Sequence, residues 1–323
     1  MKNKTLLFSL AILFLSISKV DAQDAFFRQW ESMPLHFNPA LTGNFDGMMR
    51  FRGKYRNQFQ SSLRDASFKT SAVSAEYKFN NGASRDLSLG AYGIIDKKGS
   101  LDLTDQSLNL SSSIVQRLGK SEKGNHFVGV GINLGLAKRS IDYSKARWAP
   151  GPIPDTTFNN KANFIDLSSG LYWQYQSRSH FSAQLGTALS HLNRPNVSLS
   201  ENREDKLYLR FNLHGSVEIP ITQKISIIPS FLYLSQGPSD QLLFGGNTKW
   251  YLNKENNNNL QFGFFAQTIN ELNETQVGAY VFTASTEIKS ILVGFAYDRF
   301  KYFNRDAYEL TLGYIIGRKN QTD

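Results

Sequence analysis

Apolar and polar residues alternate with period two along many long segments of this chain. In the stretch 207–219, apolar residues alternate with Tyr208 and Arg210, and the stretches 291–298 and 308–316 repeat the pattern. Period two places successive side chains on opposite faces of a β-strand. About fourteen such segments have about 10 to 16 residues each, whereas strands of soluble sheets usually have about 5 to 6. The segments are 46–59, 66–79, 86–96, 103–118, 126–141, 161–176, 179–190, 205–219, 223–235, 239–252, 258–269, 275–286, 289–300 and 305–318.

Strands of this length, apolar on one face and polar on the other, are typical of a wall that crosses a membrane at a tilt. A closed barrel also pairs every backbone group, as lipid requires. The sequence therefore predicts an all-β fold: a transmembrane antiparallel β-barrel over 46–318, with about 14 strands and a range of about 12 to 16. A soluble β-sandwich or propeller is the alternative, but it does not need an apolar outer face on nearly every strand.

The first 22 residues form a separate unit. Lys2 and Lys4 precede an apolar run at 5–18, and small residues stand at Val20 and Ala22 before Gln23. The run is too short to span a bilayer, and the pattern is typical of a cleaved secretory signal peptide. We therefore expect export to the outer membrane of a Gram-negative bacterium. An uncleaved N-terminal anchor is the other reading.

The composition excludes several classes of protein. The chain has no cysteine among its 323 residues, so a disulfide framework, a thiol nucleophile and a cysteine-ligated zinc are ruled out. No pair of its 5 histidines has a metal-ligand spacing with a carboxylate nearby, and we expect no cofactor. Nucleic-acid binding is implausible for an exported protein, so the net charge of +9 is interpreted as facing lipid headgroups or acidic partners.

Connections between the predicted strands suggest an orientation. The connections at 142–160 and 191–204 are the longest, while those at 177–178, 220–222 and 287–288 are short. Outer-membrane barrels have long external loops and short periplasmic turns. Aromatic residues near strand ends are candidates for interfacial girdles: Tyr77, Tyr92, Tyr143, Trp148, Tyr172, Trp173, Tyr175, Trp250, Tyr251 and Tyr314.

The first predicted strand carries a basic stripe on one face, formed by Arg50, Arg52, Lys54 and Arg56. Exposing each of these residues to lipid at the membrane midplane would cost about 2–4 kcal/mol, so the stripe must face the lumen or the rim. There it needs carboxylates, and polar faces of other strands offer them. The stripe therefore has two possible roles. It forms an internal salt-bridge lattice, or it forms a cationic surface that binds a peptide or an anionic solute. The candidate carboxylates are Glu76, Glu218, Asp298 and Glu309.

The stretch 23–45 does not have the pattern of a strand, because Pro34 and Pro39 interrupt it. Its aromatic residues need burial. We expect it to plug the barrel mouth or to dock on a periplasmic partner. The candidate residues for this role are Phe27, Trp30, Phe37, Asn38 and Pro39.

The connection at 148–154 contains Pro150, Pro152 and Pro154 after Trp148. A stiff segment of this kind costs little entropy to order. It is either an external ligand loop or lid, or merely a rigid surface loop. The last five residues, 319–323, follow the final predicted strand as a tail.

Several motifs resemble one known family. Phe27-Arg28-Gln29-Trp30, the run 37–43 (Phe-Asn-Pro-Ala-Leu-Thr-Gly) and the run 55–59 (Tyr-Arg-Asn-Gln-Phe) resemble the N-terminal signature of the PorP/SprF family, which belongs to the type IX secretion and gliding apparatus of Bacteroidota. Weaker matches at 166–172, 190–193, 296–298 and 308–314 extend the resemblance over nearly the whole chain after residue 22.

The resemblance implies an outer-membrane barrel that assists secretion or surface attachment of specific cargo, often large adhesins. It also implies partners among the translocon, the periplasmic ring and a peptidoglycan-binding subunit. The alternative is a passive transport barrel for hydrophobic or small solutes. An enzyme is disfavoured: Ser190, His191 and Asn193 are close in sequence, but adjacent residues of a strand point to opposite faces.

Overall fold

A computed structural model of the chain describes residues 24–58, 68–80, 85–119, 123–145, 159–200, 203–253, 257–271, 274–301 and 306–318. The predicted signal peptide (1–22), the tail (319–323) and the proline-containing stretch 148–154 lie outside the described residues. Among the described residues, no helix is both long and apolar enough to span a bilayer.

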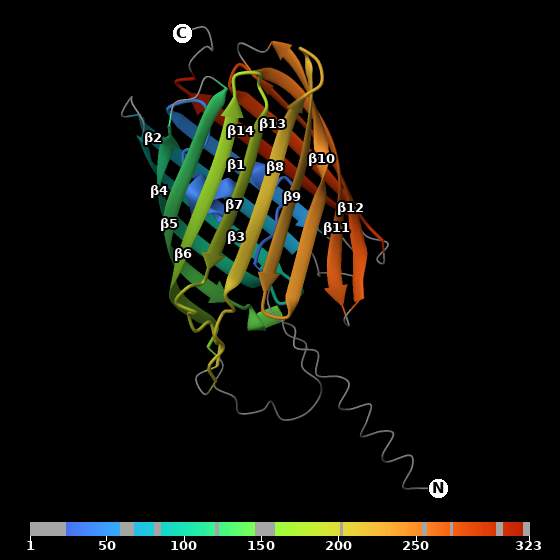
Figure 1. Cartoon of the computed structure of the whole chain (residues 1–323). Helices are drawn as coiled ribbons and strands as arrows, with labels where there is room; N and C mark the ends of the chain where they lie inside the picture. Colours follow the sequence, from blue (N-terminus) through green and yellow to red (C-terminus); the bar gives the residue numbers. More distant parts are fainter. Residues whose placement is uncertain are drawn as a thin grey trace, which may run out of the picture.

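The chain forms a closed antiparallel barrel of fourteen strands, as predicted (Figure 1). Each strand pairs with its neighbours in sequence, and β1 closes the barrel against β14, from Met49 opposite Ile316 to Gln58 opposite Ala307. The strands are β1 (Met49–Gln58), β2 (Phe68–Asn80), β3 (Arg85–Lys98), β4 (Leu103–Leu118), β5 (Gly124–Ser140), β6 (Lys161–Ser177), β7 (Ser182–Ser190), β8 (Arg210–Pro220), β9 (Ile225–Gln236), β10 (Ser239–Asn253), β11 (Asn258–Glu271), β12 (Glu274–Ile288), β13 (Ile291–Phe300) and β14 (Asp306–Ile316).

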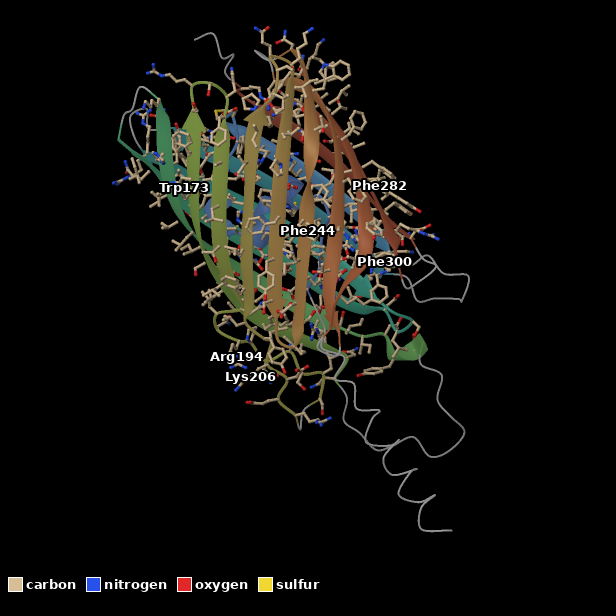
Figure 2. The ribbon with its side chains drawn as sticks, turned by 45° about the vertical axis from the view of Figure 1, so that its right-hand side comes forward. Trp173, Arg194, Lys206, Phe244, Phe282 and Phe300 are labelled. Atoms are coloured by element: carbon tan, nitrogen blue, oxygen red, sulfur yellow. The ribbon has the colours of Figure 1, made fainter. Side chains whose placement is uncertain are left out.

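The two faces of the wall differ in chemistry as the alternation requires. Val73, Ile132 and Leu312 point outward and are 64%, 68% and 62% exposed, a degree of exposure that water would penalise and lipid would not. Figure 2 shows Trp173, Phe244 and Phe282 projecting from the same outer surface. Many inward positions are buried and polar, among them Ser111, Asn133 and Thr311, and others are apolar, such as Leu232 and Phe265.

The two ends of the barrel differ in their connections. At one end, here called the turn end, short turns join β6 to β7, β8 to β9 and β12 to β13, and β1 begins beside the end of β14. At the other end, the loop end, residues 191–209 join β7 to β8. Figure 2 places Arg194 and Lys206 of that loop at the loop end. Two connections at the loop end depart from this trend, because only two residues separate β9 from β10 and only two separate β11 from β12.

Two predictions about individual positions were wrong. The segment predicted to begin at 205 becomes a strand only at Arg210, because the backbone at Leu207 bonds to Pro195 within the preceding loop and buries that side chain. Tyr92, Tyr172 and Tyr251 of the predicted girdles are buried rather than lipid-facing. They sit on the inward face of their strands, so proximity to a strand end did not reveal their direction.

Candidate functional site: the filled lumen

The lumen is occupied by the chain itself. Residues 24–48, here called the plug segment, include three short helical pieces: η1 (Trp30–Ser32), α2 (Pro34–Phe37) and η2 (Pro39–Leu41). Pro34 and Pro39 each stand at the start of a helical piece, where a missing N–H costs nothing. Phe27, Trp30 and Phe37 are buried and pack with Leu232, Leu243 and Phe265 of the wall. The aromatic residues of the segment therefore form an apolar core with inward-facing apolar residues of the wall.

Three residues of the basic stripe face the lumen and are paired with carboxylates. Arg50 donates two hydrogen bonds to Glu76, from Nε at 2.7 Å and from Nη2 at 3.0 Å. The Lys54 ammonium lies 2.7 Å from Glu309, and Arg56 lies 2.6 Å from Asp298. All six side chains are at least nine-tenths buried. These cations are thus neutralised within the wall, and Glu218, the fourth candidate carboxylate, pairs with Lys249 instead.

The plug segment joins this lattice of charges. Arg28 places its Nε 2.6 Å from the same oxygen of Asp298 that Arg56 contacts. The backbone amides of Arg28 and Gln29 both donate to Glu309, each at 2.9 Å. Lys54 of β1 donates to the carbonyl of Gln29, and Glu309 lies on β14. One short piece of the plug segment therefore binds both strands that close the barrel.

Asn38 and Pro39 are held where the wall lacks side chains. The Asn38 amide donates to the carbonyls of Leu171 and Thr187, at 2.9 and 3.3 Å, and contacts His214. A Cβ atom at Gly170 would lie 2.0 Å from the Asn38 side-chain oxygen, and one at Gly131 would lie 2.4 Å from the Pro39 backbone. Glycine is therefore required at these wall positions by the close approach of the plug segment.

Arg52 differs from the rest of the stripe. Within the described part of the chain, no carboxylate lies within ion-pair distance of its guanidinium, and its Nε has no hydrogen-bond partner. The side chain is half-buried and lines a cavity of about 330 Å³ with Glu31, Glu218 and Glu287. Ser182 and Leu292, near the starts of their strands, also line it, so the cavity lies at the turn end of the lumen.

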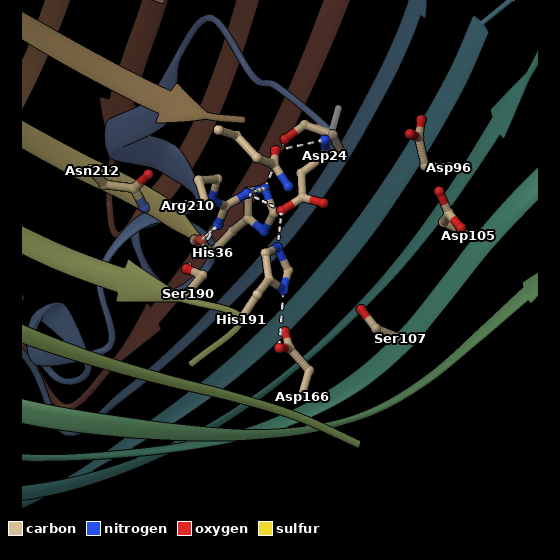
Figure 3. A network of polar contacts seen from close by, with 12 residues as sticks. Asp24, His36, Asp96, Asp105, Ser107, Asp166, Ser190, His191, Arg210 and Asn212 are labelled. Atoms are coloured by element: carbon tan, nitrogen blue, oxygen red, sulfur yellow. Dashed lines mark hydrogen bonds and ion pairs between the residues drawn. The ribbon is translucent and has the colours of Figure 1, made fainter. Parts of the chain in front are cut away.

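A polar cluster anchors the plug segment at the loop end (Figure 3). His191 donates from Nε2 to Asp24 at 2.7 Å, and its Nδ1 lies 2.9 Å from Asp166. Arg210 contacts the same Asp24 oxygen at 2.6 Å. An imidazole between two carboxylates donates from both nitrogens only when it is protonated. The plug segment thus begins at the loop end and reaches the turn end, where Arg50 donates to the carbonyl of Asn44 at 3.4 Å.

The pKa values of the cluster follow from its charges. Burial lowers the pKa of His191, but the charge of Asp24 and the hydrogen bonds to Asp166 and Asp24 outweigh burial and raise it to about 9. Burial opposes ionisation of Asp24, yet the charges of His191 and Arg210 hold its pKa well below the ordinary value. The cluster is therefore a charged clamp at neutral pH.

Sequence reasoning singled out some of these residues and missed others. Phe27, Trp30, Phe37, Asn38 and Pro39 all lie inside the lumen. Trp148 and the three prolines after it lie outside the described residues. Arg28 was noted only within the family motif and His191 only as a disfavoured catalytic residue. Their contacts with Asp298 and Asp24 were not predicted, since these partners are more than 160 residues away in sequence. The charged residues in an otherwise aromatic plug segment were the available signal.

Among the described residues, no group of histidine, aspartate and glutamate side chains is arranged to hold a metal ion. The described part of the lumen contains a polar cavity in which Arg52 has no carboxylate partner, and an internal segment held by polar contacts at both ends.

Comparisons with known proteins place the chain in context. A family model described as type IX secretion system membrane protein PorP/SprF matches residues 19–314. The chain is similar to the toluene transporter TbuX of Ralstonia pickettii, with 12% identity, a TM-score of 0.52 and coverage of 89% of this chain and 94% of that one. It is also similar to the toluene transporter TodX of Pseudomonas putida (9% identity, TM-score 0.45, 90% and 93% covered) and to CdiB from Acinetobacter baumannii (7%, 0.46, 83% and 60%). No curated protein matches the chain.

Proposed function

Because this chain belongs to the PorP/SprF family of type IX secretion system membrane proteins, we propose that it is a non-enzymatic outer-membrane component that assists secretion or surface attachment of specific cargo, such as a large adhesin. In this role the barrel binds its partners and performs no covalent chemistry. The partners are the cargo, the translocon, and periplasmic ring or peptidoglycan-binding subunits.

The observation that carries this proposal is the filled lumen. The plug segment is clamped at the loop end by His191 and Arg210 and at β1 and β14 by Lys54 and Glu309. A lumen occupied in this way does not serve as an open conduit. It leaves the rim, the loops and the turn-end cavity as the surfaces on which a partner acts.

The basic stripe then has a narrower role than its sequence suggests. Arg50, Lys54 and Arg56 are occupied by internal carboxylates, so Arg52 is the stripe residue that we propose for an anionic partner group. The turn end faces the periplasm if the long loops are external. A periplasmic partner therefore reaches Arg52 without moving the plug segment. The stretch with Pro150, Pro152 and Pro154 is proposed as a contact for cargo outside.

Passive transport of hydrophobic or small solutes is the second candidate function. The observation in its favour is the turn-end cavity of about 330 Å³, which is large enough for a small solute. The likeness to a toluene transporter at 12% identity concerns the fold alone. In this function the plug segment would act as a gate.

Affinity purification from native outer membranes tests the two functions. The tagged full-length protein is recovered, and its companions are identified by mass spectrometry. We expect one large surface protein and secretion subunits, and we expect deletion of the gene to reduce that surface protein on intact cells at least tenfold. A second arm compares Arg52→Gln with Arg85→Gln, a change at an exposed arginine of the turn end. We expect the first change alone to reduce recovery of periplasmic subunits.

Recovery of the barrel alone, from membranes in which the surface protein is abundant, contradicts the accessory role. Loss of solute uptake in the deletion strain, with the surface protein unchanged, supports transport instead. The two functions therefore differ in which measurement changes, and one strain serves for both.

A further inference from the structure

Four lysines gather on the outer wall at the loop end of the barrel. Lys69, Lys97, Lys138 and Lys161 come from β2, β3, β5 and β6, and each is exposed and faces away from the lumen. Lys69 lies directly opposite Lys97 in the pairing of β2 with β3. Each of the four stands within three residues of the loop-end terminus of its strand. They therefore form a basic edge where the wall meets the membrane surface.

This arrangement is unfavourable without an anion. Like charges directly opposite each other on one face of a sheet repel. Among the described residues, no carboxylate lies within ion-pair distance of any of the four lysines, whereas most inward-facing cations are paired. The compensating charge therefore comes from outside the described chain. On a lipid-facing wall, the groups at that height are lipid headgroups.

A groove of about 720 Å³ runs across the outer wall immediately beside this basic edge. Its lining includes the small residues Ser71 and Gly93 and the apolar residues Val73, Leu108 and Leu136, together with Lys138. Lys69 is also close to the groove, because it is the next outward residue on β2 after Ser71, which lines the groove. Lys97 lies opposite Lys69. Next outward positions on a strand are about 7 Å apart, which is within reach of a lysine side chain.

The lining of the groove is bare backbone at Gly93. A Cβ atom there would meet nothing closer than 3.7 Å, at the carbonyl of Ser107, so the glycine is not required by packing within the wall. This contrasts with Gly131 and Gly170, where the plug segment occupies the space. A long apolar groove beside positive charges fits a ligand with an anionic head and a hydrocarbon chain.

We propose that this surface binds a phosphorylated lipid of the external leaflet, with phosphate on the lysines and an acyl chain in the groove over Gly93. The assignment of the leaflet follows from the orientation with long loops outside. The site is independent of the secretion role, because it lies on the lipid-facing wall and not in the lumen. It gives the barrel a fixed lipid neighbour at β2 to β6.

Native mass spectrometry of the purified full-length protein tests the proposal, with bisphosphorylated lipid A as the probe. Three variants are compared with the original protein. Lys69→Gln with Lys97→Gln removes the opposed charges, and Gly93→Leu fills the groove. Lys224→Gln with Lys289→Gln removes two exposed lysines at the turn end and is the matched control. Each variant is first checked for the heat-dependent gel shift of a closed barrel.

We expect lipid A binding to fall at least tenfold in the first double variant and in Gly93→Leu, and to stay within twofold in the control. Dephosphorylated lipid A is expected to bind the original protein at least tenfold more weakly. Equal losses of lipid A binding in both double-lysine variants would show that the net positive charge attracts the lipid, and would contradict a specific site. Equal binding of dephosphorylated lipid A would contradict the proposal that the lysines bind the phosphate. Gly93→Leu keeps the test decisive if the lysine variant does not fold.

Discussion

At the scale of single residues, the buried charges of the lumen are the most consequential. Asp298 is fully buried and accepts from both Arg28 and Arg56 at 2.6 Å. Asp298→Asn leaves these cations without their shared counter-charge, and we expect a loss of about 3–5 kcal/mol of unfolding free energy. Urea unfolding in detergent micelles measures it. Asp306→Asn breaks the exposed pair with Arg299 and is the control, with little expected change. Similar losses in both variants would contradict the internal lattice.

The clamp of Asp24 and His191 predicts a pH dependence. The pKa of His191 is raised from about 6.5 to about 9, so its contribution is fully present below about pH 6.5 and is lost as pH rises through about 9. We expect on the order of 1–3 kcal/mol to be lost over this range. The measurement is protease cleavage of the plug segment in micelles at pH 6 and pH 9.5. His191→Gln should make cleavage nearly independent of pH, and an unchanged profile in that variant would count against the clamp.

Period two predicts the face of a residue but not its partner. The inward direction of Arg50, Lys54 and Arg56 follows from the cost of a charge in lipid. The identity of their partners depends on the order and register of the strands, which alternation does not specify. Arg28 and Asp24 lie on a segment without a period. Their charge in an aromatic segment indicates that they need partners, but it does not identify partners more than 160 positions away.

At the scale of elements, the fit between the plug segment and the wall gives a sharp contrast between two glycines. A Cβ atom at Gly131 would lie 2.4 Å from the backbone of Pro39, whereas one at Gly93 would meet nothing nearer than 3.7 Å. We expect Gly131→Ala to cost about 1–3 kcal/mol by overpacking. Gly93→Ala should be close to neutral, and urea midpoints compare the two. A neutral Gly131→Ala would mean that the plug segment does not press on β5.

Removal of the plug segment tests its role as a barrier. The strands pair through their own backbones, so a variant that lacks residues 26–41 should still close its barrel. We expect its conductance in planar bilayers to exceed that of the full chain at least tenfold. Trp30→Ala, which removes one buried ring and keeps the anchors, is the control and should stay closed. High conductance of the full chain would contradict a filled lumen.

The strands themselves were predictable, because long alternating segments separated by turn residues leave few other folds. The segment at 103–118 coincides with β4, and most other bounds differ by one to three residues. The start of β8 was not predictable by pattern, since Leu207 continues the alternation but is drawn into the preceding loop. Alternation reports where a side chain can be buried, not which backbone partner buries it.

At the scale of the whole molecule, the orientation in the membrane is directly measurable. The chain has no cysteine, so a single introduced cysteine reports its own location. Arg203→Cys lies in the loop that joins β7 to β8, and Lys224→Cys lies in the turn between β8 and β9. With long loops outside, we expect a membrane-impermeant maleimide to label only Arg203→Cys on intact cells. Both should react after lysis, and the reverse pattern on intact cells would invert the topology.

The way in which the plug segment grips the first and last strands has a consequence for assembly. Lys54 of β1 donates to the carbonyl of Gln29 and to Ser32, while the amide of Gln29 donates to Glu309 of β14. A piece of chain fastened to both edges of a seam favours the shut form of the cylinder, as any ligand favours the state that it binds. The segment is thus an internal clasp that stabilises the closed seam. Whatever withdraws it loosens the wall first along the line between β1 and β14.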